Sequence, residues 1–222
     1  MNIGIPKERR AFEYRVGMHP AGVKMLTKQG HVCYVEHEAG LGAGFSDLEY
    51  QQAGARIAYS PHEVFGRADL VLKVARPIKE EIEWLREGIT LAGFLHLGSA
   101  RQDKIELLRE KQIISIAYEQ IRLPDDSVPI RRPLSEIGGY LSAQIAARLL
   151  QNSEGGNGVL IGGVPGVPPA EVVIIGAGVA GSYAARSFLG MGAHVTILDT
   201  NISALQIVYD RAPGVVDRKS VV

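Results

Sequence analysis

Short apolar runs alternate with amphipathic stretches through residues 1–131. Runs rich in branched residues predict strands, and apolar residues spaced three or four apart predict helices. Alternating strands and helices are typical of a mostly parallel sheet covered on both faces, so we predict a three-layer α/β domain. The predicted strands are Asn2–Ile5, Val32–Glu36, Leu70–Val74, Thr90–Leu95 and Ile113–Ala117, and the predicted helices are Pro20–Gln29, Asp47–Gln52, Pro61–Phe65, Ile78–Arg86 and Arg101–Lys111. Ser46 and Ser60 are expected to cap the second and third of these helices.

The pattern changes after this domain. Leu123–Pro129 is rich in turn residues, and Leu134–Gln151 has Ile137, Leu141, Ile145 and Leu149 at helical spacing, which predicts a long linking helix. Glu154–Pro169 is dense in Gly and Pro and is expected to form a loop. We therefore divide the chain into a substrate domain (1–131), a linker (132–170), a partial nucleotide-binding domain (171–216) and a tail (217–222).

The strongest motif is VVIIGAGVAG, where an apolar run meets Gly176-Ala177-Gly178-Val179-Ala180-Gly181. This is the glycine-rich turn of a dinucleotide-binding βαβ unit. Gly176 permits the tight turn, Gly178 lets the backbone approach a pyrophosphate, and Gly181 lets helix and strand come close. The helix that follows presents free N–H groups to phosphates. The loop from Gly176 to Gly181 is therefore expected to bind a dinucleotide.

Asp199 ends the second apolar run, 23 residues after Gly176 and near the expected spacing of about 20. A carboxylate there accepts hydrogen bonds from ribose hydroxyls and repels a 2′-phosphate. Thr200 and Asn201 supply no cation for such a phosphate. The sequence therefore favours NAD over NADP.

The predicted nucleotide-binding domain is short. We expect two strands and about two helices after Val172, whereas a complete dinucleotide fold has two βαβαβ halves. Arg211–Val222 shows no amphipathic period, and we interpret the last six residues, DRKSVV, as a possible non-native tail. The chain is therefore expected to be an N-terminal fragment of a longer protein.

Composition narrows the class of protein. The 222 residues are 46% hydrophobic and contain 24 basic and 24 acidic residues, so nothing favours a nucleic-acid or membrane partner. Cys33 is the only cysteine, which excludes an intrachain disulfide or a cysteine-based zinc site, and we expect it to be buried in a strand. With no signal peptide and no long apolar run, we expect a cytoplasmic protein that binds no metal.

Three residues of the first domain are candidates for chemistry. Arg15 lies in a loop, Lys73 lies near the end of an apolar strand, and His96 directly follows another strand. Ligands of α/β sheets gather beyond the carboxyl ends of the strands. A loop arginine is also commonly a solvated charge, a strand-end lysine a rim residue and such a histidine a structural group, and the residues alone leave both interpretations open.

Several consecutive segments resemble the alanine dehydrogenase and proton-translocating transhydrogenase alpha-subunit superfamily. The likeness runs from Met1 to about Asn201, and His96 in FLHL resembles the alanine dehydrogenase branch. Two positions depart from the commoner family pattern: Arg76 stands where an acidic residue is frequent, and Tyr140 stands where an arginine is frequent. The segments are GIPKE (4–8), EYRVGMHPAGV (13–23), GHVCYVEHEAGLGAGFSD (30–47), ADLVLKVARP (68–77), LHLG (95–98), SIAYEQI (115–121), PLSEIGGYLSAQ (133–144), GGVPGVPPAEVVIIGAGVAG (162–181) and GAHVTILDTN (192–201).

The resemblance implies an NAD-dependent oxidoreductase that converts L-alanine reversibly to pyruvate and ammonia. It implies that Arg15 binds the substrate carboxylate, that Lys73 binds substrate and stabilises the carbonyl oxygen, and that His96 transfers protons. Ser135 is implied to contact the cofactor phosphates, although it could instead cap its own helix. The resemblance also implies a homohexamer.

The family uses a later aspartate beside the substrate, and residues 1–222 do not reach it. We therefore expect the chain alone to be inactive. Two alternatives stay open: an NAD(H)-binding module like the transhydrogenase alpha subunit, and a truncated NAD-binding protein without catalysis. A related opine- or lysine-forming dehydrogenase fits the N-terminal motifs less well.

Overall fold

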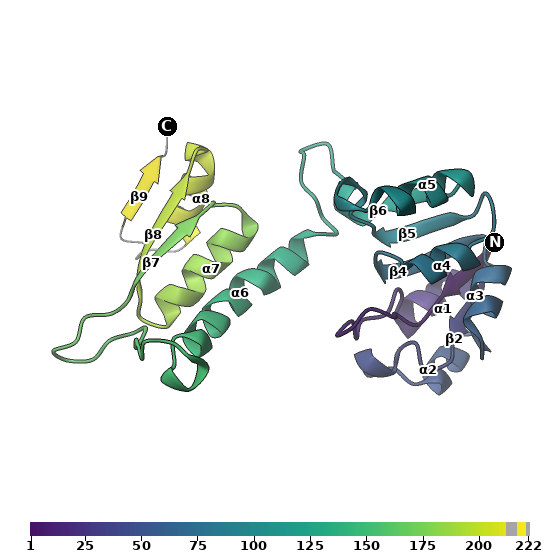
Figure 1. Cartoon of the computed structure of the whole chain (residues 1–222), viewed down its shortest axis with the longest axis horizontal. Coiled ribbons are helices and arrows are strands. Elements are labelled where there is room, and N and C mark those ends of the chain that lie inside the picture. Colours follow the sequence, from purple (N-terminus) through teal and green to yellow (C-terminus); the bar gives the residue numbers. More distant parts are fainter. Residues whose placement is uncertain (212–216, 221–222) are drawn as a thin grey trace. The chain divides into compact units, whose positions relative to one another are not determined.

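The computed structural model describes residues 1–211 and 217–220. The chain forms two compact units, Met1–Val128 and Pro129–Val222. Each unit has its own sheet, labelled in Figure 1.

The first unit alternates strands and helices as the sequence predicts. Most predicted boundaries lie within two residues of the observed ones. Its elements are β1 (Asn2–Ile5), α1 (Pro20–Lys28), β2 (Val32–Glu36), η1 (Leu41–Ala43), α2 (Asp47–Gln52), β3 (Arg56–Ala58), α3 (Pro61–Arg67), β4 (Leu70–Ala75), α4 (Lys79–Trp84), β5 (Thr90–Phe94), η2 (Leu97–Ser99), α5 (Gln102–Glu110), β6 (Ile114–Ala117) and η3 (Tyr118–Gln120).

The sheet of this unit is parallel, with the strand order β3-β2-β1-β4-β5-β6. The chain therefore starts in the middle of the sheet, runs to one edge, and returns to β4 beside β1 to build the other half. Loops leave β1 and β4 in opposite directions, so a crevice opens beyond their carboxyl ends. In sheets of this order, that switch point is where ligands bind.

Side chains from both faces of this sheet are buried. On one face Ile3, Ile5 and Leu72 pack with Val23 of α1 and Tyr50 of α2. The other face packs Val71 and Leu91 against α3, α4 and α5 through Phe65, Ile82 and Leu108. Neighbouring residues of β4 thus point to opposite faces, as a strand requires. The predicted three-layer α/β domain is confirmed, and Cys33 is buried in β2.

One strand of this unit was not predicted, and one of the two predicted helix caps makes no capping hydrogen bond. β3 has only three residues, Arg56–Ala58, which is too short for a period to be visible. Ser46 caps α2 in a capping box with Glu49. Ser60 is the N-cap residue of α3, but its side chain makes no capping hydrogen bond.

The second unit is a parallel βαβαβ arrangement in the strand order β7-β8-β9. Our expectation of two strands is wrong, because β9 adds a third beside β8. Residues 221–222 of the suggested tail lie outside the described residues, as do residues 212–216. The elements are α6 (Arg132–Leu149), η4 (Asn152–Glu154), β7 (Glu171–Ile175), α7 (Val179–Gly190), β8 (His194–Asp199), α8 (Ile202–Arg211) and β9 (Asp217–Ser220).

The long helix α6 packs closely on α7 (Figure 1). A Cβ at Gly139 would lie 2.5 Å from the Ala180 carbonyl oxygen and 2.6 Å from the Tyr183 Cβ, so only glycine permits this approach. The apolar row that predicted the helix is largely exposed, with Ile137 at 53% and Ile145 at 55%. None of the described helices combines the length and the apolar character needed to cross a membrane.

Candidate functional site

Lys73 lies in β4, beside the switch point, with its side chain fully buried. Its Nζ is 2.7 Å from Oε1 of Glu81 and 3.0 Å from Oε2 of Glu8. Glu8 follows β1, and its other carboxylate oxygen accepts the N–H of Val74 at 2.6 Å. A buried ammonium is tolerated in the protein interior because it is paired with carboxylates. Lys73 is therefore the centre of a buried ion cluster that ties β1, β4 and α4 together.

Two glycines make room around Lys73. A Cβ at Gly93 of β5 would lie 3.1 Å from the Lys73 carbonyl oxygen, so the neighbouring strand leaves space for the lysine stem. A Cβ at Gly17 would lie only 2.2 Å from the Leu72 carbonyl oxygen. The loop that carries Arg15 therefore lies directly against β4, next to Lys73.

Arg15 is half-exposed and is held by Glu13. Its Nε and Nη2 donate to the two carboxylate oxygens of Glu13 at 2.7 Å and 2.6 Å. This pairing raises the pKa of the Arg15 guanidinium and lowers the pKa of Glu13, with a smaller lowering of the latter from the charge of Lys73. Arg15 and Lys73 thus share one electrostatic neighbourhood. The Nη1 edge of the guanidinium stays available for a second carboxylate.

His96 follows β5 in a left-handed backbone conformation, with φ of 46°. Such a conformation is strained for a residue with a side chain, and here the His96 N–H donates to Oε1 of Glu119 at 2.6 Å. The exposed imidazole stacks on Phe94, with ring centroids 6.3 Å apart. The backbone is therefore fixed, while the exposed ring makes no hydrogen bond with any residue that the structure describes.

The loop that carries Arg15 lies against β4 next to Lys73, and His96 lies at the same edge of the sheet. β4 and β5 are parallel neighbours, with Ala75 opposite Phe94, so His96 lies just beyond the end of β4. Among the described residues, no hydrogen bond joins His96 to Arg15 or Lys73. Their joint action on a substrate stays a prediction.

The sequence analysis missed the carboxylates that hold these residues. Glu8 and Glu81 bind Lys73, and Glu119 binds the backbone of His96, while the buried Oε2 of Glu119 has no hydrogen-bond partner among the described residues. Acidic residues in polar stretches are ordinarily solvated, so the composition of these stretches does not indicate that Glu8, Glu81 or Glu119 holds one of these residues. Glu8 and Glu119 do follow strands at the carboxyl edge, and that position could have singled them out.

The glycine loop of the second unit has the expected geometry. Gly176 has φ of 104°, which favours glycine, and a Cβ at Gly181 would lie 1.8 Å from the Gly176 carbonyl oxygen. A Cβ at Gly178 would meet nothing within 4 Å, so the space in front of the loop is open. Within the described part of the chain no side chain caps α7, so the N–H groups of Val179, Ala180 and Gly181 are available to a phosphate.

Asp199 lies beside this loop at the end of β8. Its Oδ1 accepts the Asn201 N–H at 2.7 Å and its Oδ2 accepts the Ala177 N–H at 2.6 Å. These bonds hold the pKa of Asp199 below its ordinary value, so the carboxylate is charged at neutral pH. A pocket of about 450 Å³ is lined by Ile175, Gly176, Leu198, Asp199 and Thr200. Loop, carboxylate and pocket together fit the ribose and phosphates of a dinucleotide.

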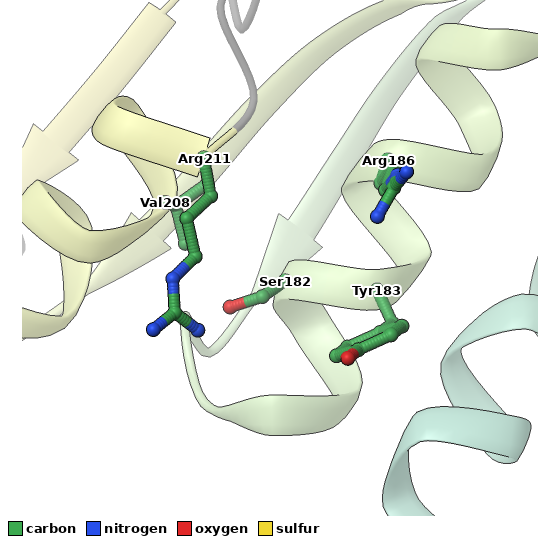
Figure 2. A pocket seen from close by; sticks show the side chains of 5 residues that line it. All are labelled: Ser182, Tyr183, Arg186, Val208 and Arg211. Atoms are coloured by element: carbon green, nitrogen blue, oxygen red, sulfur yellow. The ribbon is translucent and has the colours of Figure 1, made fainter.

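Ser135 is the fourth residue of α6 rather than its N-cap, because the helix begins at Arg132. Its N–H donates to the Arg131 carbonyl, so the alternative that Ser135 caps its own helix is wrong. Figure 2 shows a different hollow, between α7 and α8, with the side chain of Arg211 extending toward Ser182. At about 70 Å³ this hollow is too small for a dinucleotide.

Two family models cover most of the chain. Residues 4–138 match "Alanine dehydrogenase/PNT, N-terminal domain", and residues 142–219 match "Alanine dehydrogenase/PNT, C-terminal domain". An alanine dehydrogenase from Methanococcus maripaludis is 48% identical over 210 residues, which are 95% of this chain and 56% of that protein.

Solved structures agree with these matches. An L-alanine dehydrogenase superposes with a TM-score of 0.89 at 41% identity, covering 98% of this chain and 60% of that one. A transhydrogenase from Sinorhizobium meliloti superposes with a TM-score of 0.76 at 27% identity, covering 95% of this chain and 60% of that one. The chain thus spans less than two thirds of the length of each relative. It belongs to the alanine dehydrogenase/PNT family.

Proposed function

We propose that the chain contributes the substrate cations and the dinucleotide loop of an NAD-dependent alanine dehydrogenase. The reaction is the reversible oxidative deamination of L-alanine to pyruvate and ammonia. The observation that carries this proposal is that the loop of Arg15 lies against β4 next to Lys73, beside the β1–β4 switch point, in a chain that is 48% identical to a protein named alanine dehydrogenase.

Arg15 binds the substrate carboxylate in this proposal. Glu13 occupies one edge of the guanidinium and fixes its plane, so the edge formed by Nη1 and Nη2 can receive a carboxylate in a two-point contact. Glu13 is thus a positioning residue, which orients the arginine without touching the substrate.

Lys73 adds a second positive charge behind Arg15. Of the three N–H groups of the ammonium, one donates to Oε1 of Glu81, while Glu8 is an ion-pair partner without a hydrogen bond, so donors remain for the substrate oxygen. Because the side chain is fully buried, contact with a substrate requires the loop at Arg15 to move aside when the ligand enters. The developing negative charge on the carbonyl oxygen then lies near a fixed cation.

His96 moves the protons. Its imidazole can take a proton as the amine becomes an imine. It can return that proton to the departing ammonia after water adds to the imine carbon. The nicotinamide ring, when bound, accepts the hydride from the substrate carbon.

The cofactor in this proposal is NAD. The charged Asp199 accepts the ribose hydroxyls of NAD and repels the 2′-phosphate of NADP, and the glycine loop receives the pyrophosphate with Ser135 as a further contact. Entry of the ribose replaces the Ala177 N–H as a partner of the Asp199 carboxylate.

The second candidate is an NAD(H)-binding module of the transhydrogenase type, which the likeness to the Sinorhizobium meliloti structure favours. Such a module needs the glycine loop but no amino-acid site. Pyruvate binding that depends on Arg15 therefore separates the two functions.

The test titrates the chain with NADH and NADPH, following the fluorescence of the reduced nicotinamide. NADH is expected to bind at least ten times more tightly than NADPH, and Asp199→Asn is expected to narrow that ratio while the control Asp210→Asn keeps it. Pyruvate is then added to the NADH-saturated chain, and Arg15→Ala is expected to weaken its binding. Equal affinity for the two nucleotides, or pyruvate binding that is indifferent to Arg15, would refute the proposal.

A further inference from the structure

Four of the six residues that line a pocket of about 230 Å³ in the first unit are cationic. The lining residues are Arg10, Arg76, Ser99, Ala100, Arg101 and Lys104. They come from the segments that follow β1, β4 and β5, so the pocket lies along the carboxyl edge of the sheet. We call these six residues the basic pocket. Among them is no carboxylate.

Most of these cations have no counter-ion. Arg101 pairs with Asp103, its Nη2 lying 3.1 Å from that carboxylate. Arg10 donates from Nε to the Arg76 carbonyl oxygen at 2.8 Å, which anchors the two arginines beside each other without neutralising either. For the side chains of Arg76 and Lys104 there is no hydrogen bond or ion pair with any residue that the structure describes. Three of the four cations are therefore uncompensated.

The local sequence makes this arrangement unfavourable on structural grounds alone. Arg101 is the N-cap of α5 and Lys104 lies in its first turn, where the helix dipole disfavours positive charge. Arg10, Arg76 and Lys104 are each half-buried, so water screens their mutual repulsion less than at an open surface. A fold that gathers cations against local preference, with nothing to neutralise them, is typical of a binding site.

We propose that the basic pocket binds a doubly charged oxyanion, a phosphate group. Guanidinium groups form two-point hydrogen bonds with phosphate. The Ser99 hydroxyl lines the same pocket and donates to the His96 carbonyl oxygen at 3.2 Å. A single carboxylate carries too little charge for three unpaired cations. The volume is below that of a pocket for a drug-sized ligand, so the bound group is small or is the end of a larger molecule.

The basic pocket shares no lining residue with the proposed amino-acid and dinucleotide sites. The charges that bind there belong to Arg76 and Lys104, whereas Lys73 is neutralised by Glu8 and Glu81. The inference does not depend on the proposed function.

The experiment measures phosphate binding to the chain by titration calorimetry at constant ionic strength, with inorganic phosphate and with glycerol phosphate as separate probes. Arg76→Gln and Lys104→Gln are each expected to raise the dissociation constant for phosphate at least tenfold, because each removes a charged hydrogen-bond donor. Lys24→Gln removes the same charge from an exposed position on α1 and is expected to leave the constant within twofold. If glycerol phosphate binds more tightly than inorganic phosphate, the ligand is a phosphate monoester. If inorganic phosphate binds more tightly, the ligand is the free phosphate ion.

Thermal melting of the same variants guards against a merely structural effect. Because Arg76 and Lys104 repel their neighbours, both variants are expected to melt at or above the temperature of the parent chain in phosphate-free buffer. The proposal is overturned if neither probe binds, if Lys24→Gln weakens binding as much as the pocket variants, or if the pocket variants melt lower and bind phosphate unchanged.

Discussion

At the scale of single residues, buried charge determines how the candidate site is held. The positive charge of Lys73 is balanced by two carboxylates, those of Glu8 and Glu81. The guanidinium of Arg15 is oriented by Glu13, which occupies one of its edges. A sequence can indicate that a lysine in an apolar strand needs a partner. It cannot indicate which of 24 acidic residues supplies it, because that depends on which loops the fold brings to the strand.

Replacing Lys73 by Met tests the buried cluster. The change leaves Glu8 and Glu81 facing each other without their common counter-ion, and breaking a buried ion pair in this way costs about 3–5 kcal/mol of unfolding free energy. Urea denaturation measures the loss, with exposed Lys24→Met as the control, for which we expect a change within about 0.5 kcal/mol. A loss below about 1 kcal/mol for Lys73→Met would mean that the cluster does not stabilise the fold.

Glu13 provides a prediction about pH. Arg15 holds the pKa of Glu13 below its ordinary value of 4.5 in the folded chain, so the pair stabilises the fold fully above that value. The contribution disappears as pH falls through the lowered folded pKa. Glu13→Gln is therefore expected to melt below the parent chain at pH 7, and the difference is expected to shrink as the pH falls below 4.5. The measurement is the melting temperature of both chains across this pH range. A difference in melting temperature that is the same at every pH would contradict the pairing of Glu13 with Arg15.

At the scale of elements, the packing of α6 on α7 positions the glycine loop. The period of apolar residues predicted α6 within two residues at each end, but not the face it buries, because Ile137 and Ile145 of that row stay exposed. The contact is made instead by Gly139 against Ala180, in the first turn of α7. Two strands were not predicted: β3 has only three residues, and β9 has the polar sequence DRKS, so neither shows an apolar run.

Two adjacent glycines of α6 offer a matched test. Gly139→Ala places a methyl group 2.5 Å from the Ala180 carbonyl oxygen and must push the helices apart, so we expect a loss of about 1–3 kcal/mol in unfolding free energy and weaker NADH binding. At Gly138 a Cβ meets nothing within 4 Å, and Gly138→Ala is expected to stabilise the helix by about 0.5–1 kcal/mol. Equal effects at the two positions would show that the close helix contact is absent in solution.

At the scale of the whole molecule, strand order decides where function is located. The alternation of strands and helices predicted a parallel three-layer unit, and the glycine motif predicted a βαβ unit after it; both arrangements are observed. The order β3-β2-β1-β4-β5-β6 does not follow from that alternation, since many orders satisfy it. This order brings Glu8 after β1 beside Lys73 of β4. The glycine motif, in contrast, was predictable because one short segment contains the strand, the turn and the helix.

The most direct test of the account is alanine-dependent reduction of NAD by a chimera. In this chimera, the chain replaces the matching 56% of the Methanococcus maripaludis alanine dehydrogenase. We expect the chimera to form NADH from L-alanine and NAD. Arg15→Ala is expected to lower kcat/KM for alanine about a hundredfold, because two charged hydrogen bonds to the carboxylate are lost. A chimera that binds NADH but never oxidises alanine, or one that oxidises it equally well without Arg15, would contradict the account.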